Sequence, residues 1–100
     1  MLQLYNEKPV LISMKQNKSV FSVEFCNVKM KLKMCQFKLF HNYLMNISEN
    51  LTSDTHEVDL LLVRDNLNVT VSLDDFLELS NGVQSVMAKE FGFSRYRHQT

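Results

Sequence analysis

Two stretches of the chain share one pattern of hydrophobic and polar positions. Residues 27–47 align without a gap on residues 66–86, so that Asn27 falls on Asn66. In both stretches, apolar residues first alternate with polar ones and then recur three or four positions apart. Alternation is typical of a strand, and a spacing of three or four residues is typical of a helix. The shared pattern therefore predicts a duplicated unit in which a strand runs into a helix.

Each of these strands is preceded by a second alternating segment. Residues 20–25 lead through Cys26–Asn27 into the first strand, and residues 58–64 lead through Asp65–Asn66 into the second. Asn at the second turn position tolerates the positive φ that a type I′ turn requires. Two tight β-hairpins are therefore predicted, each followed by a helix.

The first predicted helix follows Met34 and has one apolar stripe, which is typical of a helix that packs on one side. The members of the stripe lie three or four residues apart: Phe37, Phe40, Tyr43 or Leu44, Ile47 and Leu51. We therefore expect this helix to bury its phenylalanines in the core. Cys35 is expected at the helix start, and His41 is expected in contact with solvent.

The second predicted helix has clear signals at both ends. Ser72 has the side chain of an N-cap, and Asp74 and Asp75 lie where the helix dipole favours negative charge. Gly92 is placed to end the helix. The apolar stripe comprises Phe76, Leu79, Val83, Val86 or Met87, and Phe91. Gly82, inside the helix, costs about 1 kcal/mol relative to Ala, which predicts a close approach of another backbone.

These elements predict an α+β fold in a single domain, residues 1–100. Two hairpins that each expose an apolar face are stabilised most simply by pairing in one mainly antiparallel sheet, with both helices on one face. The two ββα copies, approximately residues 19–51 and 57–91, would then be related by an approximate two-fold axis. Residues 10–14 are expected as an edge strand or a flap over the core, and residues 93–100 as a frayed tail.

Composition places the chain among ordinary globular domains, with 45% hydrophobic and 22% charged residues. Eleven basic and eleven acidic residues balance, so that no global charge indicates a nucleic-acid partner. A domain of this size buries only about 60–65% of its unfolded surface and is marginally stable alone. Oligomerisation, most simply as a homodimer, is therefore expected.

The sequence lacks the signals of export and of membrane insertion. The N-terminal residues have no basic leader before an apolar core, and no apolar run approaches the roughly 18 residues of a membrane span. Cys26 and Cys35 lie on either side of one predicted strand, which is too long for them to pair with each other. Free thiols are typical of a reducing compartment. These features predict a cytoplasmic protein.

No group of residues has the pattern of a catalytic or metal centre. A metal site requires three or four converging ligands, and the cysteines and histidines are scattered. Cys35 would act as a nucleophile only if His56 or His98 reached it in the fold. Asp74 and Asp75 fit a helix start better than an acid–base pair. We therefore predict a protein that is not an enzyme and that binds no metal or cofactor.

One series of features between residues 20 and 87 is shared with a known family. It comprises Asn27 before the alternation, the spacing of Phe40 and Tyr43–Leu44, and the pair Asn66–Leu67 ahead of an acidic helix start. In these features the chain resembles a family of small uncharacterised proteins of Bacteroidota. The resemblance implies a cytoplasmic bacterial protein and supplies no reaction. Some members carry cysteines and a histidine ahead of the first hairpin, but this chain has neither there, so that no metal or redox site is carried over.

The outward face of the predicted sheet is the candidate partner surface. Apolar side chains are expected on it at Leu61 and Val63, and basic ones at Lys29, Lys31 and Lys33, with Leu11 as a further candidate contact residue. Apolar groups on a solvated face often mark an interface. We therefore predict a non-enzymatic protein–protein interaction or homo-oligomerisation module that acts through a sheet face or edge, with the lysines steering the partner.

The same lysines leave a second function open. Together with the basic tail Arg95–His98 they could contact phosphates in a nucleic-acid-binding module. Lysines along a strand also keep an exposed edge soluble and protect it from aggregation, without any nucleic acid. The interaction module is the preferred interpretation, and nucleic-acid binding is the alternative.

Overall fold

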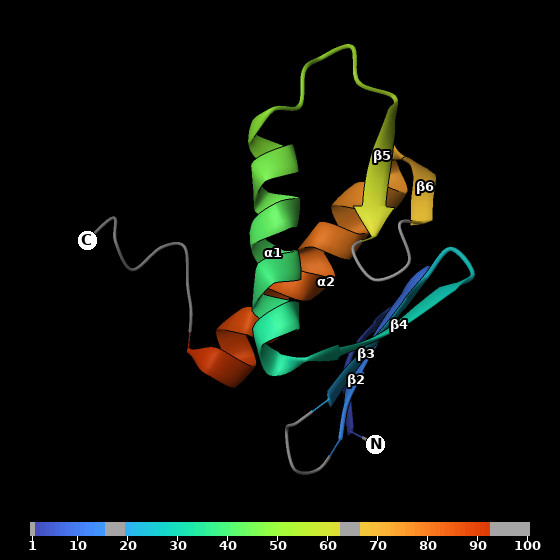
Figure 1. Ribbon diagram of the computed structural model, residues 1–100. Helices are drawn as coiled ribbons and strands as arrows, with labels where there is room; N and C mark the ends of the chain where they lie inside the picture. The colour runs from blue at the N-terminus through green and yellow to red at the C-terminus, as the bar shows by residue number, and fades with distance from the viewer. Residues whose placement is uncertain (1, 16–19, 63–66, 93–100) are drawn as a thin grey trace.

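The computed structural model describes residues 2–15, 20–62 and 67–92. Within these ranges the elements are β1 (Leu2–Glu7), β2 (Val10–Met14), β3 (Val20–Phe25), β4 (Val28–Lys33), α1 (Met34–Glu49), β5 (Glu57–Leu62), β6 (Leu67–Ser72) and α2 (Leu73–Phe91). Figure 1 shows α1 and α2 crossing each other, with β2, β3 and β4 near the N-terminal end of α1 and the β5–β6 hairpin beside its C-terminal half. The protein is therefore α+β with two helices, as predicted.

Strands β1, β2, β3 and β4 form one antiparallel sheet in that order. β3 and β4 are joined by Cys26 and Asn27, whose φ values of 47° and 67° are both left-handed. Two consecutive left-handed residues are the mark of a type I′ turn, so the first predicted hairpin and its turn type are confirmed. The Asp65–Asn66 turn lies outside the described residues.

The N-terminal strands differ from the prediction. β2 lies inside the sheet between β1 and β3 and not at its edge, and its Val10, Ile12 and Met14 are buried. β1, which was not predicted, forms the edge. Its pairing register shifts between Gln3 and Tyr5, and its side chains are exposed or half-buried. The shift interrupts the alternation of β1, which removes the usual sequence signal of a strand.

β5 and β6 form a separate two-stranded sheet, which corrects the predicted single sheet. The order strand–strand–helix occurs twice along the chain, but the two hairpins do not share a sheet, and the expected two-fold arrangement within one sheet is not observed. The reason is the position of β2. It occupies one side of β3, so the β3–β4 hairpin keeps only the lysine-bearing edge of β4 for pairing with a second hairpin, and such an edge disfavours pairing.

Each helix begins directly where a strand ends. α1 starts at Met34, and the side chain of Gln36 accepts a hydrogen bond of 2.8 Å from the backbone N–H of Lys33. α2 starts after Ser72, whose hydroxyl accepts a bond of 3.1 Å from the backbone N–H of Asp75, and ends at Gly92 with a left-handed φ of 64°. The N-cap and C-cap predicted for the second helix are therefore confirmed.

The core lies between the four-stranded sheet and the two helices. Phe21 on β3 and Phe37 on α1 are fully buried, and their rings stack with centroids 4.6 Å apart. Phe76, Leu79, Val83 and Val86 of α2 are fully buried as well. Both predicted stripes therefore face the core, with Leu44 buried and Tyr43 only half-buried in the first helix.

Two predictions about the helices need correction. Gly82 makes room for a side chain and not for a backbone: a Cβ there would lie 2.8 Å from two ring carbons of Tyr5 on β1. The Tyr5 hydroxyl also donates to a carboxylate oxygen of Glu78, one turn earlier on α2. His41 is buried, with 4% of its surface exposed, because it follows Phe40 on the side of α1 that faces the interior.

Candidate functional site

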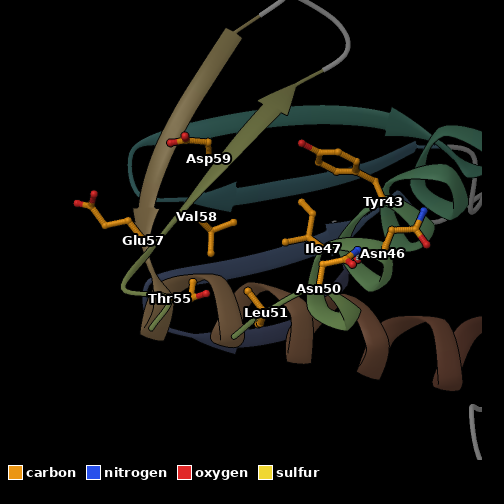
Figure 2. A pocket seen from close by; sticks show the side chains of 9 residues that line it. All are labelled: Tyr43, Asn46, Ile47, Asn50, Leu51, Thr55, Glu57, Val58 and Asp59. Carbon is orange, nitrogen blue, oxygen red and sulfur yellow. Dashed lines mark hydrogen bonds between the residues drawn. The ribbon is translucent and has the colours of Figure 1, made fainter. Parts of the chain in front are cut away.

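An open groove of about 380 Å³ lies between the second half of α1 and strand β5. We call it the α1–β5 groove, and its lining residues are Tyr43, Asn46, Ile47, Asn50, Leu51, Thr55, Glu57, Val58 and Asp59. Figure 2 shows Tyr43, Asn46, Ile47 and Asn50 on one side, from α1, and Val58 across from them on β5. A concave surface next to a strand is where a partner chain would find both side-chain and backbone contacts.

The helical side of the groove follows from residue spacing. Positions 43, 46, 47 and 50 are separated by three or four residues, so they share one side of α1. Tyr43 and Ile47 are half-buried, whereas Asn46 and Asn50 are exposed. The Asn50 side-chain amide donates a bond of 2.8 Å to the backbone carbonyl of Asn46. The groove therefore has an apolar floor with an amide rim.

Tyr43 ties α1 to the strand edge. Its hydroxyl accepts a hydrogen bond of 2.8 Å from the backbone N–H of Leu61 on β5. Because β6 pairs with β5 along the other edge, this N–H points away from β6. Leu61 and its partner Asn68 are thus a pair that does not exchange backbone hydrogen bonds.

The alternation of the antiparallel ladder then fixes the direction of the neighbouring groups. Glu57, Asp59 and Leu61 are two residues apart, so the backbone N–H and C=O of Glu57 and Asp59 also point away from β6. The bond of 2.9 Å from the Leu73 N–H to the His56 carbonyl agrees, since it makes the pair next to Glu57 a bonded one. The free edge of β5 therefore presents backbone donors and acceptors beside the groove.

The side chains of β5 divide between two faces. Val58, Leu60 and Leu62 are buried, whereas Glu57, Asp59 and Leu61 are exposed. Asp59 accepts a bond of 2.6 Å from the Thr70 hydroxyl on β6, which holds its carboxylate on the exposed face. In Figure 2, Glu57 and Asp59 point away from α1, while Val58 points toward the groove. The free edge is thus acidic on one face and apolar on the other.

Two of the predicted apolar partner residues, Leu61 and Leu11, lie on different sheets. Leu61 is 53% exposed, as expected for a contact residue, and its backbone N–H bonds to Tyr43, which lines the α1–β5 groove. Leu11 is half-buried on the outward face of the four-stranded sheet, opposite Glu24. Leu61 and Leu11 therefore do not share a sheet face. Val63 lies outside the described residues.

The predicted lysines lie on β4, at the edge of the four-stranded sheet. Lys29, Lys31 and Lys33 are all exposed, and they alternate with Leu32 and other side chains that turn toward the core. Glu24 lies directly opposite Lys29 on β3. The lysines are on a different sheet from Leu61, so one surface that joins them, as predicted, is not observed.

Neither cysteine has the surroundings of a nucleophile among the contacts of residues 2–15, 20–62 and 67–92. Cys26 donates through Sγ to a carboxylate oxygen of Asp75 at 3.5 Å. Burial raises the pKa of the Cys26 thiol, and the hydrogen bond and negative charge of Asp75 raise it further. Cys35 is exposed at the start of α1, His56 is exposed before β5, and His98 lies outside the described residues.

The structure contains no cluster of three metal-binding side chains in the part of the chain that it describes. Asp74 and Asp75 both lie in the first turn of α2, as predicted for a helix start. No helix in this part is long and apolar enough to cross a membrane. The absence of catalysis, the absence of a cofactor and the cytoplasmic location therefore stay predictions from the sequence.

The sequence analysis missed most of the groove. The apolar stripe predicts Tyr43 as a core residue, and no predicted site includes Asn46, Asn50 or Thr55. The available signal was the second stripe on α1, in which amides alternate with Tyr43 and Ile47. That stripe does not say what it faces, because the sequence does not reveal that β5 lies alongside α1.

No protein-family model, curated protein or solved structure matches this chain. The resemblance to Bacteroidota proteins therefore stays a prediction. The features of the molecule that bear on its function are the α1–β5 groove and the edge of β5 beside it.

Proposed function

We propose that this protein is a non-enzymatic interaction module that binds a segment of another protein by adding it as a strand to the free edge of β5. The observation that carries the proposal is the edge itself: the outward-pointing backbone groups of Glu57 and Asp59, beside the α1–β5 groove. In strand addition, main-chain hydrogen bonds supply affinity and flanking pockets select alternate side chains.

The surroundings of the edge favour this mode of binding. Leu61, exposed at one end, offers apolar surface that a partner would remove from water. Ile47 and Val58 offer more within the groove. A bare edge with such neighbours is a template for another strand, whereas natural edges that must stay single are usually covered or charged with lysine.

Strand addition is tested best by a proline at an outward-pointing position. Asp59→Pro removes an N–H that makes no bond to β6, so the hairpin is retained while an added strand loses a donor. Lys31→Pro is the matched control, because the Lys31 N–H points away from β3 in the same way. Circular dichroism checks that both variants are folded.

A displayed library of random seven-residue peptides serves as the probe. Peptides enriched on the wild-type protein should bind the Lys31→Pro variant and lose at least about tenfold in affinity for Asp59→Pro, a change of about 1.4 kcal/mol. Enriched peptides that bind both variants equally would contradict strand addition at β5.

Other parts of the proposal rest on the sequence. We place the module in the cytoplasm, because its two cysteines are free, and we regard its two strand–strand–helix segments as products of duplication. A second copy of the chain is the alternative partner, which would make the module a homodimer. Nucleic-acid binding through Lys29, Lys31 and Lys33 stays a prediction, and Arg95–His98 lie outside the described residues.

A further inference from the structure

We infer that the segment bound at β5 is an extended peptide in which basic residues alternate with aliphatic ones, the basic residues lying over Glu57 and Asp59. This inference rests on the proposed function and adds the chemistry of the partner. It follows from three properties of the edge: the two faces of an added strand, the charge of one face and the shape of the other.

An added strand continues the alternation of the strand it joins. Its side chains point in turn to the face of Glu57, Asp59 and Leu61 and to the face of Val58. Residues opposite one another on neighbouring strands lie close enough to interact, and opposite charges there are favourable while like charges are unfavourable. The residues of β5 therefore select alternate residues of the partner.

The exposed face selects positive charge. Among the nine residues that line the α1–β5 groove, two are carboxylates and none is basic. The Thr70 hydroxyl bonds to one oxygen of Asp59 and so orients this carboxylate, which retains further acceptor positions. Lysine or arginine on the partner would pair with Glu57 and Asp59, and acidic residues there would be repelled.

The groove face selects aliphatic side chains. Ile47, Leu51 and Val58 supply apolar surface, and the ring of Tyr43 closes one end where its hydroxyl reaches Leu61. The groove is open and has about 380 Å³ of space, which admits branched aliphatic side chains from a strand at the edge. Burying such side chains removes apolar area from water on both partners.

A second copy of this chain fits less well than a free segment. Its β4 has the right alternation, with lysines between apolar residues. However, Leu32 is buried, and Val28 and Met30 pack against the core of their own domain, so they are not available to enter a groove. The occupant must offer side chains on both faces, which an extended segment without its own core does.

The test compares three labelled peptides with the intact protein: TKVKVKT, its acidic counterpart TEVEVET and its neutral counterpart TTVTVTT. Fluorescence anisotropy should show the basic peptide binding at least about tenfold more tightly than the neutral one, and the acidic peptide most weakly. The preference for the basic peptide should decrease as salt is raised, because exposed charges are screened.

Two double variants locate the preference. Glu57→Gln with Asp59→Asn should bring the basic and neutral peptides to equal affinity, without abolishing binding. Glu7→Gln with Glu24→Gln removes the same formal charge from the four-stranded sheet and should leave the preference intact. Asp59→Pro should weaken all three peptides, since it removes a backbone donor as well as the carboxylate.

The outcomes separate the two proposals. If all three peptides bind equally and Asp59→Pro weakens them, strand addition stands and the inferred basic partner is wrong. If no peptide binds at concentrations up to about 1 mM, both fail. If light scattering shows a dimer that Asp59→Pro converts to a monomer, the occupant is a second copy and the inferred segment is wrong.

Discussion

Each of the two sheets contacts a helix through one tyrosine, and the two contacts are of different kinds. Tyr5 of β1 lays its ring against Gly82 of α2 and donates its hydroxyl to Glu78. Tyr43 of α1 instead uses its hydroxyl to accept the backbone N–H of Leu61 on β5. The first contact packs an aromatic face against a helix, and the second occupies a single group of a strand edge.

The contact of Tyr5 contributes to the stability of the fold, whereas the contact of Tyr43 leaves backbone groups of β5 available to a partner. The ring of Tyr5 lies against Gly82, so its loss would disturb the packing of α2 on the four-stranded sheet. Tyr43 protects one N–H and leaves those of Glu57 and Asp59 pointing outward. The four-stranded sheet thus packs on α2 through β1 and carries lysines on its β4 edge, whereas the β5–β6 sheet keeps an edge to which a strand can be added.

The largest effect is expected from Gly82→Ala. The new methyl group meets the Tyr5 ring at 2.8 Å, and overpacking of this kind costs about 1–3 kcal/mol, partly offset by about 1 kcal/mol of helix propensity. Urea unfolding should show a net loss of up to about 2 kcal/mol. In a Tyr5→Ala background the ring is gone, so the same change should stabilise by about 1 kcal/mol. A loss of equal size in both backgrounds would mean that Tyr5 is not the obstacle.

The next effect is a loss of stability at high pH. Burial, and then the hydrogen bond and charge of Glu78, raise the pKa of Tyr5 from 10.0 to about 12. Between these values the native protein keeps a proton that the unfolded chain releases, so the free energy of unfolding falls as pH rises through this window.

Urea unfolding at a series of pH values measures this dependence. The Tyr5→Phe variant is the control, because it keeps the ring against Gly82 and lacks the titrating proton. Its stability should fall less steeply above about pH 10 than that of the wild type. Parallel curves for the two proteins would show that Tyr5 titrates normally in the fold.

A smaller change is expected from Tyr43→Phe, which removes only the hydroxyl that accepts from Leu61. A lost hydrogen bond costs about 0.5–1.5 kcal/mol. Hydrogen exchange read by NMR should show the Leu61 amide exchanging faster, while the amides of Val58 and Leu60, which face β6, change little. Slower or unchanged exchange at Leu61 would exclude Tyr43 as its protector.

The smallest change in stability is expected from Lys29→Thr combined with Lys31→Thr. Both side chains are exposed, so the free energy of unfolding should move by less than about 0.5 kcal/mol for each substitution. Light scattering should nevertheless show new association, because lysine on an edge strand opposes pairing between molecules. A protein that stays equally dispersed would show that these lysines do not protect β4.

Local features of the fold were predictable because their causes are local. The turn at Cys26–Asn27, the cap at Ser72 and the stop at Gly92 each depend on a few neighbouring residues. The partner of each strand was not predictable, because alternation identifies a face and not a neighbour. β1 escaped prediction since its register shift breaks the alternation, and the pairing of β2 with β3 could not be predicted from the alternation of either strand.

The candidate site was predicted only at Leu61. Its exposure follows from alternation along β5, which depends on local sequence alone. The groove depends on α1 lying beside β5, a long-range contact that neither segment encodes by itself. Gly82 is a similar case. A glycine inside a helix indicates a close neighbour, but the sequence does not reveal that this neighbour is the ring of Tyr5.

Ser72 closes β6 and also caps α2, so a single residue belongs to both elements. Because no residue separates the two elements, separating β6 from β5 would disturb the N-cap of α2, and unfolding the first turn of α2 would disturb β6. A chain bound to β5 would therefore stabilise the start of α2. Because Tyr5 of β1 packs against Gly82 of α2, this stabilisation would extend to the four-stranded sheet.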